Sequence, residues 1–367
     1  MLSAKTRLRP ELAPLASYNS GLTLADVKDR CGGGPIAKLG SNENPYPAAP
    51  EVAAAMAAAL GQAHVYPDPG GRALAEVLSA RTGVPTGQIL FGDGSEDLLN
   101  VLARCLLGPG DEVVTLYPSF PLHEDYAVMM GAGVTRIGLT PDHAIDMAAL
   151  LSAAARPVRL ILIANPMNPA GLWLSPEDLD ALLAAQHPDA VLCLDEAYVE
   201  YARGAGYMEG TARLMSHDKP LLVLRTFSKA YGMAGLRIGY GLSNDAELVR
   251  GMNLVRTPFN VNAPAQAGAL AALAHEGAMR AAVAEVTAER ARMAEVLTRL
   301  GCRVLPSRGN FLFVETGQAA VALADRLVDG GVIVKPWKQP GYETWLRVSV
   351  GLRCENDQFL AALAALL

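Results

Sequence analysis

Short apolar runs alternate with longer amphipathic segments along the chain up to about residue 244. The apolar runs predict strands at 88–91, 112–116, 134–139, 158–164, 191–194, 221–224 and 237–241. The amphipathic segments predict helices, the clearest at 51–60, 72–81, 95–107, 121–130, 147–155 and 176–186. Strands that are apolar on both faces and alternate with helices favour an α/β fold, in which helices cover a mostly parallel, seven-stranded sheet.

The pattern changes after about residue 244, where long helical segments are followed by short strands. Helices are predicted at 263–275, at 277–300 and at the C-terminus, with strands near 303–305, 310–314, 332–334 and 345–350. This order predicts a second, smaller α+β domain. We therefore expect an N-terminal arm at 1–50 that contributes to the small domain, a large domain at 51–255 and a small domain at 256–367.

Composition narrows the possible partners. The 367 residues are 51% hydrophobic and carry a net charge of −6, which argues against nucleic acid or an anionic membrane as the main partner. The five cysteines are scattered without a CxxC pair, and the six histidines show no metal-binding spacing. No apolar run approaches the roughly 20 residues of a membrane span, and the N-terminus lacks a signal-peptide core. We expect a soluble cytoplasmic protein without a metal.

Lys229 is the first candidate for chemistry. It lies in the stretch LRTFSKAYGMAGLR at 224–237, next to Ser228 and just after the strand predicted at 221–224. Open α/β sheets place ligands at this end of their strands. A lysine without full hydration loses its charge more easily and offers the free amine that Schiff-base chemistry needs. A solvated loop lysine is the alternative, and for a lysine considered alone it would be favoured.

Phosphate and ring contacts are predicted at three other strand ends. The stretch GDGSED at 92–97 could hold a phosphate monoester at a helix start with Gly94, Ser95 and Glu96, although Ser95 could instead cap the helix. Phe120 could stack on a flat ring or belong to the core, and Asn168 could donate to a phenolate oxygen or form a plain turn.

A buried acid and a basic side chain complete the set. Asp195 ends a strand that should be central in the sheet, where a carboxylate is costly unless a cation such as a pyridinium nitrogen meets it. Backbone N–H groups could satisfy it instead. Tyr198 could reach the phenolic oxygen of the same ring. Arg347 lies in an apolar strand and could hold a substrate carboxylate or form an internal salt bridge, and Lys335 and Trp337 could face the same pocket.

These groups converge on one cofactor. An amine, an acid for a pyridinium, an amide and a phenol for a phenolate, a helix start for a phosphate and an arginine for a carboxylate are what pyridoxal 5′-phosphate requires. The convergence favours this cofactor over the separate structural explanations.

The sequence resembles the fold-type-I pyridoxal-phosphate aminotransferases, and within them the histidinol-phosphate aminotransferases. The resemblance runs nearly end to end and rests on the segments SNENPYP at 41–47, YPDPGG at 66–71, GDGSED at 92–97, NPMNPAG at 165–171, LDEAYVEY at 194–201, LRTFSKAYGMAGLRIGYG at 224–241, RTPFNVN at 256–262, RGNFLFV at 308–314 and LRVSVG at 346–351. It implies an aspartate-aminotransferase-like fold.

The resemblance also implies residue roles. Lys229 forms the Schiff base and shuttles the proton, Asp195 keeps the pyridine nitrogen protonated, and Tyr198 assists as the third catalytic residue. The cofactor contacts implied are Gly94, Ser95, Glu96, Phe120, Asn168, Asp195, Tyr198, Thr226, Ser228, Lys229 and Arg237, with Tyr66 reaching the phosphate of a neighbouring subunit in a homodimer. The substrate contacts expected are Arg347, Lys335, Asn44 and Tyr46.

One departure bears on the substrate. The family usually has an arginine where this chain has Lys335 in the stretch VIVKPW, and lysine lacks the two-pronged geometry of arginine. The expected reaction is amino transfer from L-histidinol phosphate to 2-oxoglutarate, with an aromatic amino-acid aminotransferase as the alternative. A decarboxylase of phosphothreonine type and a non-catalytic cofactor-binding module are further alternatives.

Overall fold

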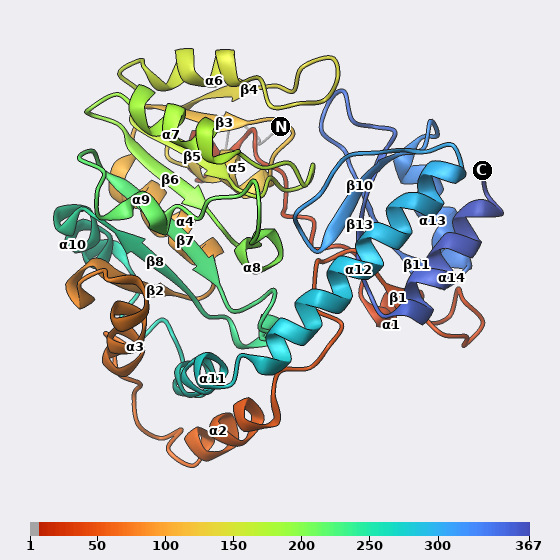
Figure 1. The fold of residues 1–367 in the computed structure, drawn as a ribbon, viewed down its shortest axis with the longest axis horizontal. Helices are drawn as coiled ribbons and strands as arrows, with labels where there is room; N and C mark the ends of the chain where they lie inside the picture. Colours follow the sequence, from red (N-terminus) through yellow and green to blue (C-terminus); the bar gives the residue numbers. More distant parts are fainter. Residues whose placement is uncertain (1–6) are drawn as a thin grey trace.

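The computed structural model describes residues 7–367 and has a seven-stranded sheet at its centre (Figure 1). The strands lie in the order β2-β8-β7-β6-β5-β3-β4, and only β8 runs antiparallel to its neighbours. Their bounds are β2 Ile89–Gly92, β3 Glu112–Leu116, β4 Gly133–Ile137, β5 Leu160–Ala164, β6 Val191–Asp195, β7 Leu221–Thr226 and β8 Gly239–Ser243. The prediction of a mostly parallel sheet of seven strands is confirmed, and β6 is its middle strand.

Helices cover both faces of this sheet because successive side chains of a strand point to opposite faces. On β6, Val191 and Cys193 belong to one apolar cluster, whereas Leu192 and Leu194 belong to another. The first cluster includes side chains of α4 (Ser95–Leu106), α5 (Pro121–Met129) and α10 (Ala246–Val255), and the second includes those of α3 (Arg72–Thr82), α6 (Met147–Ala154) and α7 (Pro176–Ala185). Burial on both faces explains the uninterrupted apolar runs in the sequence.

A second, four-stranded antiparallel sheet lies apart from the first, with the strand order β12-β13-β10-β9 (Figure 1). The strands are β9 Arg303–Val304, β10 Phe311–Glu315, β12 Lys335–Pro336 and β13 Trp345–Ser349, and the neighbouring helices are α12 Gly277–Arg299, α13 Ala320–Asp329 and α14 Arg353–Ala364. The N-terminal segment joins this part of the chain, because β1 (Ala37–Lys38) pairs in parallel with β11 (Val332–Ile333). The boundaries of the three parts at residues 50 and 255 stay predictions.

The remaining helices are shorter or lie outside these two groups. They are α1 Leu24–Val27, α2 Pro50–Leu60, α8 Val199–Ala202, α9 Thr211–Leu214 and α11 Ala263–Ala274, with short 3-10 turns at Pro10–Leu12, Thr86–Gln88 and Ala234–Leu236. Pro50 opens α2 at the first helical position, where its missing N–H costs nothing. No helix within residues 7–367 is both long and apolar enough to cross a membrane.

The structure corrects some details of the predicted elements. Arg237 does not open the strand predicted at 237–241, because its φ of 58° places it in a left-handed turn before β8. Two amphipathic helices, α10 and α13, have no counterpart among the predictions. Ser95 does not cap α4: the N-cap is Gly94, and Ser95 is the first helical residue. The first six residues of the predicted arm lie outside the described residues.

Candidate active site

Lys229 lies three residues beyond the end of β7, at the carboxyl edge of the large sheet. Its side chain is partly buried, and its Nζ donates to the carbonyl oxygen of Ser41 at 3.2 Å. The loss of hydration, reinforced by the Arg347 guanidinium, lowers the pKa of Lys229 to about 8. Partial burial and the bond to the Ser41 carbonyl argue against the solvated loop lysine considered as the alternative.

Asp195 ends β6, the strand next to β7, and is nearly buried. Its Oδ1 accepts a hydrogen bond from the backbone N–H of Ala197 at 3.1 Å. The backbone therefore satisfies one of the two carboxylate oxygens. Its Oδ2 lies 3.1 Å from Nε2 of His123, a buried residue in the first turn of α5. The carboxylate is therefore fixed by two partners. Lys229 and Asp195 both follow the carboxyl ends of neighbouring parallel strands, because β6 ends at Asp195 and pairs with β7, which Lys229 follows.

Tyr198 lies three residues after Asp195, at the N-cap of α8, and its ring lies near the Lys229 amine. Its ring centroid lies 5.8 Å from Nζ of Lys229. Its hydroxyl oxygen accepts from Nδ2 of Asn42 at 3.0 Å and from Nδ2 of Asn168 at 3.3 Å. Burial raises the pKa of Tyr198 to about 12, against the opposing effects of Arg347 and Asn42. Because both amides donate, the hydroxyl keeps its own proton available for another acceptor.

Arg347 enters this cluster from the second sheet. On β13 its Nη1 donates to Oδ1 of Asn168 at 2.9 Å and its Nη2 to the carbonyl oxygen of Gly40 at 2.7 Å. Its buried Nε has no hydrogen-bond partner within the described residues, and no salt bridge to it occurs there. Burial lowers the pKa of Arg347. A buried guanidinium without a carboxylate is well suited to bind an anionic group.

The start of α4 and the guanidinium of Arg237 form a second polar cluster. No side chain caps α4, because its N-cap is Gly94 with φ of 87°. A Cβ at Gly94 would lie 2.5 Å from Nη2 of Arg237, so only glycine allows this close approach. Arg237 donates through Nη1 to Oγ of Ser228 at 3.3 Å and through Nη2 to the carbonyl oxygen of Asp93 at 3.0 Å. An uncapped helix start beside a guanidinium favours an anion.

The neighbouring predicted residues are arranged as follows. Oγ1 of Thr226 accepts from the backbone N–H of Ser228 at 3.1 Å. The carboxylate of Glu96 accepts from the hydroxyl of Tyr126. Phe120 immediately precedes α5, and its ring lies edge-on to His123 with 5.7 Å between centroids.

The predicted substrate residues divide into two groups. Lys335 pairs with Arg347 in register between β12 and β13, and burial together with Arg347 lowers the pKa of Lys335 to about 8. Its amine donates to the carbonyl oxygen of Asn19. Trp337 is buried, with its ring centroid 5.9 Å from Cζ of Arg347.

Asn44 and Tyr46 form the other group, which contacts the backbone next to Lys229. Nδ2 of Asn44 donates to the carbonyl oxygen of Ala230 at 2.8 Å, and Oδ1 of Asn44 accepts from the backbone of Tyr46 at 3.0 Å. Asn44 and Ser228 help to line a cavity of about 390 Å³. Tyr66 is far more exposed, at 77%, and stacks on Phe259 with 4.5 Å between ring centroids.

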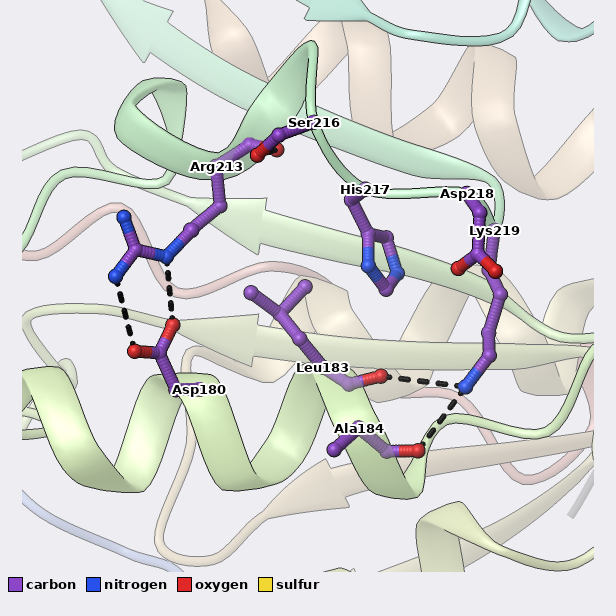
Figure 2. A pocket seen from close by; sticks show the side chains of 8 residues that line it. All are labelled: Asp180, Leu183, Ala184, Arg213, Ser216, His217, Asp218 and Lys219. Atoms are coloured by element: carbon purple, nitrogen blue, oxygen red, sulfur yellow. Dashed lines mark hydrogen bonds and ion pairs between the residues drawn. The ribbon is translucent and has the colours of Figure 1, made fainter.

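A different cavity, of about 300 Å³, contains none of the predicted residues (Figure 2). Two of its basic side chains have partners: Arg213 pairs with Asp180 at 2.8 Å, and Nζ of Lys219 donates to the carbonyl oxygen of Ala184 at 3.0 Å. Figure 2 shows these contacts along α7 and the segment that leads into β7.

Three residues near the site were not predicted from the sequence. His123 contacts Asp195, Asn42 contacts Tyr198, and Tyr18 lies edge-on to Phe120 with 6.3 Å between ring centroids. His123 stands three positions after Phe120, close to one helical turn, but this spacing gives no sign of its partner Asp195, 72 residues away. Asn42 belongs to the SNENPYP segment, but its partner lies 156 residues away. Tyr18 has no comparable signal.

Comparison with known proteins now identifies the family. The protein family described as "aminotransferase class I and II" matches this chain over residues 35–363. The chain belongs to the class I and II aminotransferases. It is 49% identical to histidinol-phosphate aminotransferase 1 of Mesorhizobium japonicum over all of both chains. It is 47% identical to histidinol-phosphate aminotransferase 3 of Rhizobium meliloti over 97% of this chain and 96% of that protein.

Solved aminotransferase structures share the fold. The histidinol-phosphate aminotransferase from Sinorhizobium meliloti, solved in complex with pyridoxal 5′-phosphate, is 29% identical and superposes with a TM-score of 0.89 over 99% of this chain and 98% of that one. An aspartate aminotransferase variant from Thermus thermophilus, 24% identical, superposes with a TM-score of 0.81 over 98% and 99% of the two chains. The predicted aspartate-aminotransferase-like fold is confirmed.

Proposed function

We propose that this aminotransferase binds pyridoxal 5′-phosphate and transfers the amino group of L-histidinol phosphate to 2-oxoglutarate, giving imidazole-acetol phosphate and L-glutamate, a step of histidine biosynthesis. The observation that carries the proposal is the position of the Lys229 amine at the carboxyl edge of the large sheet, just past β7 and next to β6, which ends at the buried Asp195. The names of the full-length relatives favour amino transfer over the decarboxylase and the non-catalytic module.

The chain's own atoms fit the cofactor. The uncapped start of α4, with Ser228 and Arg237 beside it, matches a phosphate monoester. The carboxylate of Asp195 matches a pyridinium nitrogen, and the free proton of the Tyr198 hydroxyl matches a phenolate oxygen. The cofactor contacts proposed are Gly94, Ser95, Glu96, Phe120, Asn168, Asp195, Tyr198, Thr226, Ser228, Lys229 and Arg237.

Each residue then has a defined task. When bound, pyridoxal phosphate supplies an electron sink for the charge that develops on the donor's α-carbon. Lys229 Nζ, neutral above its pKa, takes the proton from that carbon and later returns one. Asp195, oriented by His123, holds a cationic ring nitrogen. Arg347 orients the acidic group of the donor or acceptor, and the two substrates use the site in turn.

Lys335 is proposed to bind the phosphate of the donor, and its replacement gives a specificity test. Lys335→Met is expected to lower kcat/KM for L-histidinol phosphate by about 10–100-fold, the worth of one hydrogen bond to a charged group. For L-phenylalanine, which has no phosphate, the change should be small. The matched control is Lys338→Met, which removes the same charge from an exposed neighbour.

A full donor panel completes that measurement. Equal losses for both donors in Lys335→Met would contradict the phosphate contact. A wild-type preference for an aromatic amino acid over L-histidinol phosphate would favour the alternative function, an aromatic amino-acid aminotransferase. Asn44 and Tyr46 are proposed as further substrate residues.

We further propose a cytoplasmic homodimer with shared sites. The dimer is supported by Tyr66, which is 77% exposed and stacks on the exposed Phe259, so that an aromatic pair is open to a partner subunit. In this proposal Tyr66 reaches the phosphate of the cofactor on the other subunit. Mixing Tyr66→Ala with Lys229→Ala chains should restore activity at limiting cofactor, since one site of each mixed dimer is intact. If each chain works alone, mixing restores nothing.

A further inference from the structure

Two amide side chains connect β13 to the same hydroxyl. Arg347 donates to Oδ1 of Asn168 at 2.9 Å, and Nδ2 of Asn168 donates to the Tyr198 hydroxyl at 3.3 Å. Ser349, two residues along β13 and therefore on the same face, donates to Oδ1 of Asn42 at 2.9 Å. Nδ2 of Asn42 then donates to the Tyr198 hydroxyl at 3.0 Å. These bonds form two paths, one through Asn168 and one through Asn42, and in each path every donor points toward the Tyr198 hydroxyl.

Asn42 is held more firmly than a packing residue requires. It is 1% exposed and has φ of 54°, a left-handed conformation that is uncommon for any residue with a side chain. Its backbone N–H donates to Oγ of Ser349 at 2.8 Å, and its carbonyl oxygen accepts from Nδ2 of Asn310 at 3.0 Å. Four hydrogen bonds thus fix both the backbone and the amide of this one residue.

We propose that Asn42 is a positioning residue for amino transfer, which keeps the Tyr198 hydroxyl oriented with its proton toward the ring oxygen of the cofactor. The proposal rests on the proposed function. A hydroxyl has two acceptor positions and one proton. Asn42 and Asn168 occupy the two acceptor positions, so the proton is left to donate into the site.

The two hydrogen-bond paths begin at different kinds of donor. The Asn168 path begins at Arg347, a cation that also has to bind the anionic group of each substrate. The Asn42 path begins at Ser349, a buried neutral residue whose hydroxyl bonds to Asn42 alone within residues 7–367. The Asn42 contact is therefore the one that stays unchanged as substrates come and go. Its hydrogen bond also lowers the pKa of Tyr198 against the effect of burial, which strengthens the hydroxyl as a donor.

The test is the pH titration of the absorbance of the holoenzyme, without substrate. The basic form of the Lys229–cofactor chromophore carries negative charge on the ring oxygen, so a weaker Tyr198 donor destabilises that form and raises the pKa of the chromophore. Asn42→Gly removes the amide and accepts the positive φ without strain. We expect it to raise that pKa by about 0.5–1 unit, the equivalent of one hydrogen bond. Ser349→Ala should shift it in the same direction by less.

Asn356→Ala is the matched control. Asn356 is equally buried, and its amide makes three hydrogen bonds, two with Gly351 and one with Glu289, without reaching Tyr198. It should lower the melting temperature and leave the chromophore pKa within about 0.2 unit. An unchanged pKa in Asn42→Gly, or an equal shift in Asn356→Ala, would overturn the proposal. A wild-type protein with no chromophore would instead remove the proposed function itself, and the inference with it.

Discussion

Replacing Lys229 by alanine is expected to lower kcat by about 10⁴-fold or more, because one side chain supplies both the reactive amine and the proton carrier. Residues that act in several steps lose most of the rate when removed singly. The variant should still fold, since the side chain of Lys229 makes a single hydrogen bond within residues 7–367, to the Ser41 carbonyl. Borohydride reduction followed by mass spectrometry should give a cofactor adduct at Lys229 in the wild type and none in the variant.

Lys219→Ala is the control for this experiment. Its amine is bound to the end of α7, in the cavity of Figure 2, and takes no part in the proposed chemistry. Uptake of pyridoxal phosphate by cofactor-free wild type should also accelerate as the pH rises through about 8, because the neutral fraction of Lys229 grows above its lowered pKa. An adduct that persists in Lys229→Ala would reject the assignment of the amine.

The large sheet could be predicted because its strands are buried on both faces and therefore lack polar residues. The helices between them show the complementary amphipathic pattern. The two missed helices carried usable signals: Asp245 caps α10 by accepting from the backbone N–H groups of Glu247 and Leu248. Arg237 was assigned to a strand because an apolar run follows it, and no local pattern reveals that its φ is positive.

The site could be predicted to the extent that its residues follow strand ends. Lys229 and Asp195 end up near each other because parallel strands bring their carboxyl ends to one edge. The contacts of His123 and Asn42 could not be predicted, because they join positions 72 and 156 residues apart. The wrong capping role of Ser95 has a different cause. The start of a helix can be predicted from sequence only to within one or two residues. A shift of one residue decides whether Ser95 caps α4 or leaves the first backbone N–H groups of α4 free.

Asp195→Asn is expected to lower kcat by about 10²–10³-fold, since removing one member of a buried charge pair costs roughly 3–5 kcal/mol. The amide has nearly the shape of the carboxylate but offers no negative charge to a cationic ring nitrogen. The control is Asp180→Asn, which removes a surface carboxylate paired with Arg213 (Figure 2) and should leave kcat unchanged. Steady-state kinetics with saturating cofactor separate this loss from weaker binding.

His123→Gln distinguishes orientation from charge at the same carboxylate. Gln can keep a hydrogen bond to Asp195 but cannot place it as the imidazole does, 3.1 Å from Oδ2 at a buried position. A loss of only about 10-fold is expected, within the worth of one hydrogen bond. Because Asp195 is the group that meets the cofactor, the double variant His123→Gln with Asp195→Asn should be no slower than Asp195→Asn alone. If the loss of kcat in the double variant were the product of the two single losses, His123 would act independently of Asp195. That result would contradict the proposal that His123 acts on the ring nitrogen through the Asp195 carboxylate.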